Sequence, residues 1–205
     1  AWSGLKEIGK PKAGETLVVG GASGPVGATV GQIGKILGLK VVGIAGGPDK
    51  CAHAVDTLGF DACVDYKADD FAERLKAETG DGIDVYFENV GGVHLEAAIN
   101  SARPFARFAL CGMISQYNET GKPEGPSNII QAVGKSLRLE GFIVSNHADM
   151  FPQFAKDMAE WIKAGKITWK ETVEEGVERA PDAFVKLFTG ENLALVLQQV
   201  GVVGV

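Results

Sequence analysis

A glycine-rich turn between an apolar run and a helical pattern constrains this chain more than any other feature. The run Thr16-Leu17-Val18-Val19 leads into three glycines spaced as Gly21-x-x-Gly24-x-x-Gly27. The order of strand, glycine turn and helix is typical of a dinucleotide site, where backbone N–H groups and the positive end of a helix dipole hold a pyrophosphate. The glycines permit the tight turn and the close packing of helix on strand. The helical period follows at Val26, Val30, Ile33 and Leu37.

Composition and motif content argue against several classes of partner. The chain has 205 residues and a formal net charge of −6 without a basic stripe, so we expect no nucleic-acid partner. No apolar run is long enough to cross a bilayer and the sequence does not open on a secretory signal, so we expect a cytoplasmic protein without a membrane partner. The cysteines and histidines lack the spacing of metal ligands, so we expect no metal site.

Short apolar runs alternate with helical patterns along most of the chain. This alternation predicts an α/β fold, a Rossmann-type doubly wound parallel sheet of six strands with right-handed crossovers. In such a sheet ligands bind at the carboxyl ends of the strands. The six expected strands are 16–19, 40–45, 62–66, 83–87, 107–112 and 137–144.

The pattern changes character near residue 167. Residues 1–166 are expected to form the dinucleotide-binding domain, and residues 167–205 a strand–helix–strand appendage. The first residue is Ala1, and the residues after it are typical of a helix that has no capping residue before it. We therefore expect the chain to be a fragment of something longer.

The residues beyond the second strand indicate which nicotinamide cofactor is bound. An NAD site usually carries an acidic residue about 20 positions beyond the glycine turn, where this chain has Ile44-Ala45-Gly46-Gly47. These small neutral residues leave room for a phosphate, and Lys50 at the start of the next expected helix can hold a 2′-phosphate. Tyr66, at the tip of the neighbouring strand, can donate a hydrogen bond to it. We predict NADP(H) as the cofactor.

Several local motifs match a known family in order and spacing. The chain resembles the cofactor-binding part of a zinc-free medium-chain dehydrogenase/reductase, and in particular the leukotriene/prostaglandin reductases, also called alkenal/one oxidoreductases. The resemblance runs from Trp2 to about Asn192. The motifs that carry it are Ala22-Ser23-Gly24-Pro25-Val26-Gly27, Leu58-Gly59-Phe60-Asp61, Asp65-Tyr66-Lys67, Glu88-Asn89-Val90-Gly91-Gly92, Cys111-Gly112-Met113-Ile114-Ser115-Gln116-Tyr117-Asn118 and Glu191-Asn192-Leu193.

The resemblance implies a role for each matching position. The glycine turn would hold the pyrophosphate, and Lys50 and Tyr66 the 2′-phosphate. Asn89 and the stretch from Cys111 to Tyr117 would line the nicotinamide ribose and the adjoining phosphate. Phe142, Ile143 and Val144 would wall the nicotinamide, and Asn192 would close over the cofactor. The cofactor-binding residues expected on this basis are Ser23, Gly24, Pro25, Val26, Gly27, Lys50, Tyr66, Asn89, Cys111, Gly112, Ile114, Ser115, Tyr117, Phe142, Ile143, Val144 and Asn192.

The same resemblance implies an activity, the NADPH-dependent reduction of the carbon–carbon double bond of α,β-unsaturated carbonyl compounds. No acid–base triad is required for hydride transfer, and Tyr117 is the candidate proton donor to the enolate. The alternatives are a quinone reductase of the same superfamily and a non-catalytic NADPH-binding module.

The family also implies a homodimer and an N-terminal GroES-like catalytic domain, absent from this sequence, on which residues 167–205 would pack. Two departures leave the substrate preference open. Relatives usually carry Gly-Lys where Ala194-Leu195 stand, and some carry tyrosine at the position of Ser145.

Overall fold

The computed structural model describes residues 1–118, 120–121, 125–189 and 195–199. The chain divides into two compact units, Ala1–Ile167 and Thr168–Val205. Within the described residues, no helix combines the length and the apolar character that crossing a membrane requires.

The first unit is built on a parallel sheet of six strands, as the sequence predicts. The strand order is β3-β2-β1-β4-β5-β6, so the direction of winding reverses between β1 and β4. This is the order of a dinucleotide-binding sheet, in which the crevice at the reversal point receives the ligand. The strands are β1 (Thr16–Gly20), β2 (Lys40–Ala45), β3 (Ala62–Asp65), β4 (Ile83–Glu88), β5 (Ala102–Leu110) and β6 (Arg138–Gly141).

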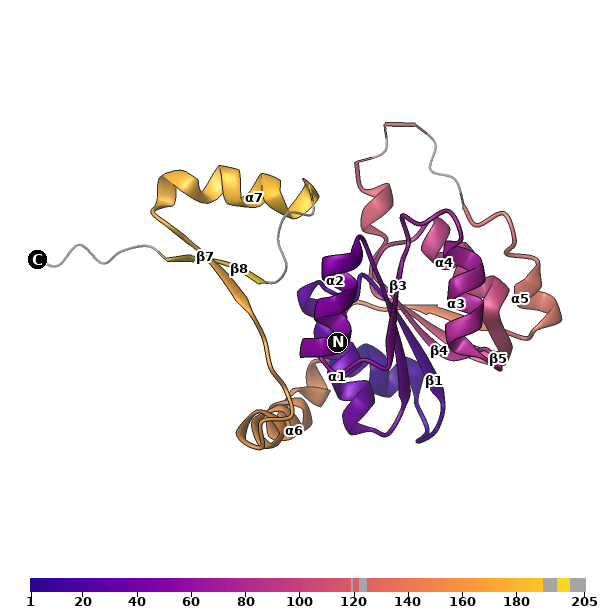
Figure 1. Cartoon of the computed structure of the whole chain (residues 1–205). Coiled ribbons are helices and arrows are strands. Elements are labelled where there is room, and N and C mark those ends of the chain that lie inside the picture. The colour runs from indigo at the N-terminus through magenta and orange to yellow at the C-terminus, as the bar shows by residue number, and fades with distance from the viewer. Residues whose placement is uncertain (119, 122–124, 190–194, 200–205) are drawn as a thin grey trace, which may run out of the picture. The chain divides into compact units, whose positions relative to one another are not determined.

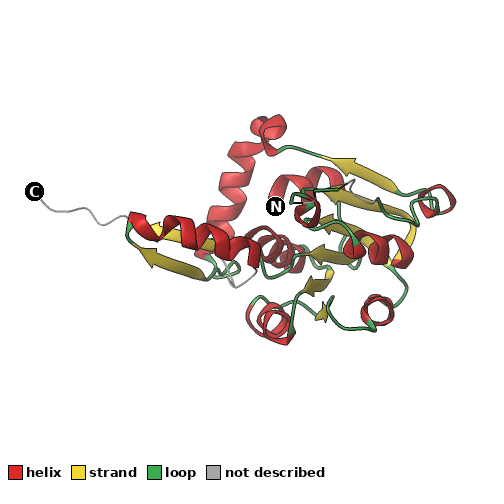
Figure 2. Ribbon diagram, turned by 90° about the horizontal axis from the view of Figure 1, so that it is seen from above, coloured by secondary structure: helices red, strands yellow, loops and turns green. Residues whose placement is uncertain are grey.

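Helices cover both faces of this sheet (Figures 1 and 2). Figure 1 shows α1 and α2 on one side of the sheet and α3, α4 and α5 on the other. The helices are α1 (Pro25–Ile36), α2 (Pro48–Ala52), α3 (Phe71–Thr79), α4 (Val93–Ser101), α5 (Gln131–Gly134) and α6 (Phe151–Lys163). Short 3₁₀ or π turns complete the unit: η1 (Gly4–Gly9), η2 (His53–Thr57), η3 (Ile114–Gln116) and η4 (Val144–Met150).

Alternation along each strand divides the apolar residues into two cores. Leu17 and Val19 of β1 belong to one core, together with residues of η1 and α1 and partly buried residues of α6. Val18, between them, belongs to the other core, which includes Phe71 and Leu75 of α3 and residues of α4. Successive side chains of a strand point to opposite faces, so both faces of this sheet are buried, as helices on both sides require.

The structure corrects several expected boundaries. The strand expected at 107–112 begins earlier, at Ala102, and its register against β4 shifts between Ile83 and Val85. Phe105 has a φ of 67°, and its N–H bonds to the carbonyl of Lys135 outside the sheet. The sixth strand is shorter than 137–144, because the chain turns away after Gly141 and enters η4 at Val144.

The second unit contains the strand–helix–strand sequence that the pattern predicts. It consists of β7 (Glu171–Glu175), η5 (Val177–Arg179), α7 (Ala180–Thr189) and β8 (Leu195–Gln199), and the two strands pair in parallel. Parallel strands need a crossover connection that returns the chain to the same end of the sheet, and α7 lies in this connection between β7 and β8.

Replacing Phe108 by alanine is expected to lower the free energy of unfolding by about 3–5 kcal/mol, because the ring is fully buried against Tyr86 and a cavity would remain. Phe105→Ala is the matched control on the same strand, since its ring is 73% exposed, and its cost should stay within about 0.5 kcal/mol. Denaturant unfolding of both variants measures the difference, and similar losses would contradict this assignment of the core.

Candidate functional site

In the glycine turn after β1, the backbone at the start of α1 packs closely on the backbone at the end of the strand. Gly21 has a φ of 64°, and the N–H of Gly24 bonds to the Gly21 carbonyl at 3.0 Å. A β-carbon added to Gly27 would lie 2.3 Å from that same carbonyl oxygen. Only glycine therefore allows the first turn of α1 to pack this closely on the end of β1.

The N-terminus of α1, where the sequence predicts an anion site, has no side-chain cap. Gly24 is the capping residue, and it supplies no side chain to bond the first helical N–H groups. Pro25 occupies the start of the helix, where its missing N–H costs nothing. The N–H groups of Val26 and Gly27 thus lie at the positive end of a twelve-residue helix, an arrangement suited to a phosphate.

The ends of β2 and β3 are tied together by a carboxylate. Asp65 accepts hydrogen bonds through Oδ1 from the N–H groups of Gly47, at 2.8 Å, and Lys67, at 3.0 Å. The pKa of Asp65 is lowered, mainly by the Lys67 N–H, with the Gly47 N–H contributing. Tyr66 follows, and a β-carbon on Gly46 would lie 2.9 Å from its ring. Glycine at position 46 therefore lets Tyr66 lie across the tip of β2.

Lys50 of α2 and Lys67, which directly follows Tyr66, influence each other's charge. Burial lowers the pKa of Lys50, and the positive charge of Lys67 lowers it further, so the two ammonium groups influence each other. The Lys67 side chain also lies close to Gly46, where an added β-carbon would be 3.3 Å from its Cε. An anion placed between these cations would relieve their repulsion. Lys67 was not among the expected site residues, although it directly follows Tyr66 in a matching motif.

A buried histidine supports Tyr66 from beneath. The ring centroid of His94 lies 4.6 Å from that of Tyr66 and 5.9 Å from that of Phe71. His94 is 2% exposed, and neither ring nitrogen has a hydrogen-bond partner among the described residues. Burial lowers its pKa to about 4, so the ring is neutral at neutral pH. Sequence reasoning gave His94 no role, and no signal in the sequence places it beneath Tyr66.

The loops after β4 and β5 interlock. Asn89 donates from Nδ2 to the carbonyl of Gly20 at 2.7 Å, which ties the end of β4 to the end of β1. The carbonyl of Val90 accepts both the N–H of Ser115, at 3.0 Å, and its hydroxyl, at 2.5 Å. The N–H of Ile114 bonds to the Asn89 carbonyl at 3.2 Å. The structure thus brings these expected residues together, and some of their hydrogen-bonding groups hold the two loops in place.

The backbone beyond β5 is anchored to the same point. The N–H groups of Cys111 and Gly112 both bond to the carbonyl of Glu88, at 2.9 and 3.2 Å. The Tyr117 hydroxyl accepts the N–H of Met113 at 3.2 Å, while the side chain is 65% exposed. Tyr117 is thus positioned by its own loop and presents its ring to solvent.

Glu88 places a fully buried carboxyl group beneath these loops. Its Oε1 accepts the N–H of Val90 at 2.6 Å, and its Oε2 accepts the hydroxyl of Tyr86 at 3.1 Å. Burial raises the pKa of Glu88 despite the N–H donors around it, and burial likewise raises the pKa of Tyr86. Sequence reasoning did not select Glu88, although it begins one of the matching motifs.

The three residues expected to wall the nicotinamide point in different directions. Phe142 turns inward: its ring stands 6.1 Å from Phe87, and a β-carbon on Gly4 would overlap it. Ile143 and Val144 are exposed, at 64% and 70%. Of the three, Val144 lines the pocket described next.

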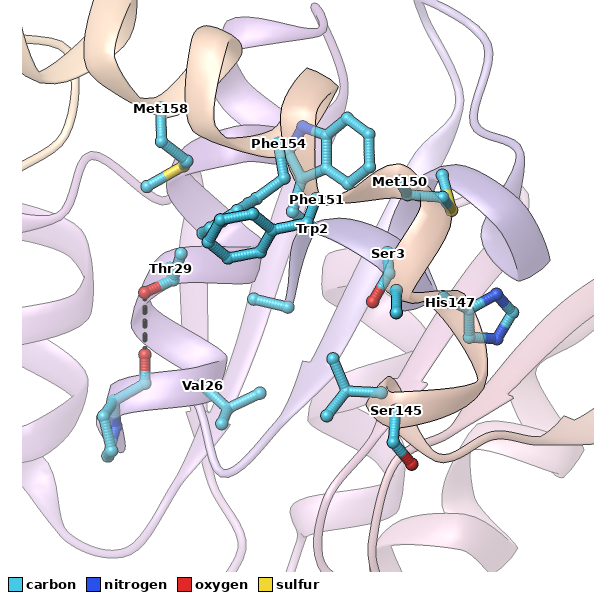
Figure 3. A pocket seen from close by; sticks show the side chains of 14 residues that line it. Trp2, Ser3, Val26, Thr29, Ser145, His147, Met150, Phe151, Phe154 and Met158 are labelled. Carbon is cyan, nitrogen blue, oxygen red and sulfur yellow. Dashed lines mark hydrogen bonds between the residues drawn. The ribbon is translucent and has the colours of Figure 1, made fainter.

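An apolar pocket of about 840 Å³ adjoins the glycine turn (Figure 3). Val26 and Thr29 of α1 form one wall, and Phe151, Phe154 and Met158 of α6 face them (Figure 3). Trp2 is held there by a hydrogen bond from Nε1 to Asp157 at 3.0 Å. The remaining lining residues are Ala1, Ser3, Pro25, Val144, Ser145, His147, Ala148 and Met150.

Asn192 lies outside the described residues. Among those that are described, no group of three or more histidine, cysteine, aspartate or glutamate side chains could hold a metal ion. The zinc-independent reaction expected from the sequence stays a prediction.

Comparisons with known proteins agree with this geometry. The family described as zinc-binding dehydrogenase matches residues 25–163. The NADPH-dependent curcumin reductase of Escherichia coli is 46% identical over 98% of this chain and 59% of its own length. The NADP-dependent 2-alkenal reductase of Nicotiana tabacum is 43% identical over 94% of this chain and 56% of its own length.

A solved structure gives the same result. CurA of Vibrio vulnificus in complex with NADPH superposes with a TM-score of 0.93 at 47% identity, covering 98% of this chain and 61% of that one. The chain therefore spans about three fifths of the length of these relatives.

The free energy of unfolding is expected to fall by about 3 kcal/mol as the pH is lowered from 6.5 to about 4. Folded His94 takes up its proton only near pH 4, whereas the unfolded residue does so near 6.5, so the unfolded state binds more protons within this window. His94→Phe should lack this contribution. Denaturant unfolding of both proteins across the window measures it, and parallel pH profiles would refute the neutral buried imidazole.

Proposed function

Because the chain belongs to the zinc-binding dehydrogenase family, we propose that it is the cofactor-binding part of an NADPH-dependent reductase of carbon–carbon double bonds. The observation that carries the proposal is the presence of two features at one edge of the sheet. The first is the N-terminus of α1, which follows a glycine turn and has no side-chain cap. The second is the group of two lysines and a tyrosine that follows β2 and β3. The first arrangement suits a pyrophosphate and the second suits an additional phosphate. Together they match the polar groups of NADPH.

The glycine turn fits the pyrophosphate of this cofactor. Gly27 lets the first turn of α1 pack on the end of β1, and the N–H groups of Val26 and Gly27 would hold the phosphate oxygens. Ser23 precedes them and can add a hydroxyl donor. The fit depends on backbone groups, so it requires glycine more than any particular side chain.

Lys50, Tyr66 and Lys67 would hold the 2′-phosphate. Asp65 orients both sides of this site, because its single Oδ1 atom fixes the N–H groups of Gly47 and Lys67. His94 fills the space behind the Tyr66 ring and holds it at the tip of β3. No carboxylate stands at the end of β2, where an NAD site would have one.

The apolar pocket would receive the substrate. NADPH, when bound, supplies a hydride to the β-carbon of an α,β-unsaturated carbonyl compound. Val26, Val144 and Phe151 offer this substrate an apolar surface. Tyr117 is our candidate proton donor to the enolate, since its hydroxyl oxygen is fixed by Met113 while its ring is exposed. The small unsaturated aldehydes and ketones form the proposed substrate class.

We also propose that residues 167–205 pack on a GroES-like catalytic domain and that the protein works as a cytoplasmic homodimer. The strand β6 supports the dimer, because it is an edge strand of the sheet and its outer N–H and C=O groups are open to pairing with a second copy. Light scattering coupled to gel filtration tests this assembly.

Titration of the 205-residue chain with NADPH and NADH, followed by fluorescence, tests the cofactor site. Lys50→Ala and Lys67→Ala should each weaken NADPH binding about tenfold or more, because each removes a charged partner of the 2′-phosphate. NADH binding should stay within about twofold. The exposed Lys76→Ala on α3 is the control and should leave both affinities unchanged. Equal weakening of NADPH and NADH would contradict the assignment.

Turnover by the complete gene product tests the reaction. We expect NADPH oxidation, followed by absorbance, to depend on a 2-alkenal or an enone and to yield the saturated carbonyl compound. Oxidation with a quinone alone would favour the quinone reductase, and cofactor binding without turnover would favour a binding module.

A further inference from the structure

Two thiols meet beside the proposed 2′-phosphate site. Cys51 of α2 and Cys63 of β3 have their Sγ atoms 3.0 Å apart. Both residues are free cysteines of intermediate exposure. A disulfide has a sulfur–sulfur distance of about 2.05 Å, so the two atoms need approach by only about 1 Å to form one. The third cysteine, Cys111, lies beyond β5 in another part of the site.

The packing holds one thiol firmly and links the other to a site residue. The Cys63 sulfur lies over Gly43, where an added β-carbon would be 3.1 Å away, so β2 supports it from below. Cys51 directly follows Lys50 on the short helix α2. Burial is the main cause of the raised pKa of both thiols, and the charge of Asp65 raises it further. This carboxylate ends β3, two residues beyond Cys63. The pair thus connects the helix that carries Lys50 to the strand that leads to Tyr66.

We propose that Cys51 and Cys63 form a reversible disulfide, a modification site that clamps α2 to β3 behind the 2′-phosphate site. The oxidant is a peroxide. One thiolate attacks a peroxide oxygen, which breaks the O–O bond and gives a sulfenic acid and one water; the second thiol then displaces a second water as the S–S bond forms. The two sulfurs together lose two electrons and two protons, and hydrogen peroxide is reduced to two waters.

Cys51 is the attacking thiol. The Cys63 thiol donates a hydrogen bond to the Cys51 sulfur at 3.0 Å, which favours the thiolate form of Cys51. Burial raises the pKa of both groups. The reaction should therefore be slow at neutral pH and accelerate as the pH rises. The short distance between the sulfurs favours closure of the disulfide over further oxidation of the sulfenic acid.

The clamp has a consequence that rests on the proposed function. A 2′-phosphate held by Lys50 on α2 and by Tyr66 and Lys67 beyond β3 restrains these two elements relative to each other. The disulfide supplies the same restraint before the ligand arrives, so the oxidised protein should bind a 2′-phosphate ligand more tightly, by a few fold. By linkage, the bound ligand should make the disulfide harder to reduce by the same factor.

The first measurement is the oxidation itself, on the reduced 205-residue chain treated with hydrogen peroxide at pH 8.5. The wild type and the control Cys111→Ser should each lose two titratable thiols and 2 Da of mass, both restored by dithiothreitol. Cys51→Ser and Cys63→Ser should not lose 2 Da. The melting temperature of the oxidised control should rise by about 5 °C or more, because the cross-link joins positions twelve apart. A gain of oxygen mass without the 2 Da loss would overturn the proposal.

The second measurement compares the oxidised and reduced wild-type chain by calorimetric titration with adenosine 2′,5′-bisphosphate and with 5′-AMP, which lacks the 2′-phosphate. We expect tighter binding of the bisphosphate alone after oxidation. Unchanged or weaker binding would overturn the clamp. If the reduced protein binds neither nucleotide, the proposed cofactor site fails, while the thiol count and the mass still decide whether the disulfide forms.

Discussion

The contact between Gly27 and the carbonyl group of Gly21 sets the position of everything that follows β1. Because a β-carbon at Gly27 would stand 2.3 Å from that oxygen, α1 can begin directly over the end of the strand only when the side chain is missing. A second close approach continues the arrangement: a β-carbon on Gly43 would lie 2.8 Å from the β-carbon of Ala22. The glycine turn can therefore rest on β2, with Ala22 bonded to the Ile44 carbonyl.

The residues that follow from this packing are those that the sequence could indicate. A strand, a glycine turn and a helix start are local patterns, and the ends of parallel strands meet at one edge of the sheet by topology. Lys50 and Tyr66 could thus be predicted as site residues from their places after two strands. The number of strands and their parallel course likewise follow from the alternation of apolar runs and helices.

Other features depend on contacts between distant segments, which spacing does not reveal. Phe142 turns inward because Gly4, far away in the sequence, leaves room for its ring. Lys67 reaches the site because Asp65 holds its backbone, and the same carboxylate fixes Gly47 across the gap between two strands. Glu88 carries a buried carboxyl group that no apolar pattern would place in a core. Its backbone donors and Tyr86 reduce the cost of burial, and its raised pKa shows that they do not remove it.

The two cores on opposite faces of the sheet have a consequence for how the protein tolerates change. Val18 and Val19 are neighbours in sequence, yet each packs into a different core and shares no apolar surroundings with the other. Substitutions of Val18 and Val19 should therefore have additive effects on the free energy of unfolding. A substitution of Val19 should instead couple to one of Phe87, which is distant in sequence but lies in the same core. The face that bears α1 and α6 borders the pocket, and the face that bears α3 and α4 supports Tyr66 through His94. The proposed 2′-phosphate site therefore draws on both faces of one sheet, since Lys50 lies on α2 beside α1 and Tyr66 packs on His94 of α4.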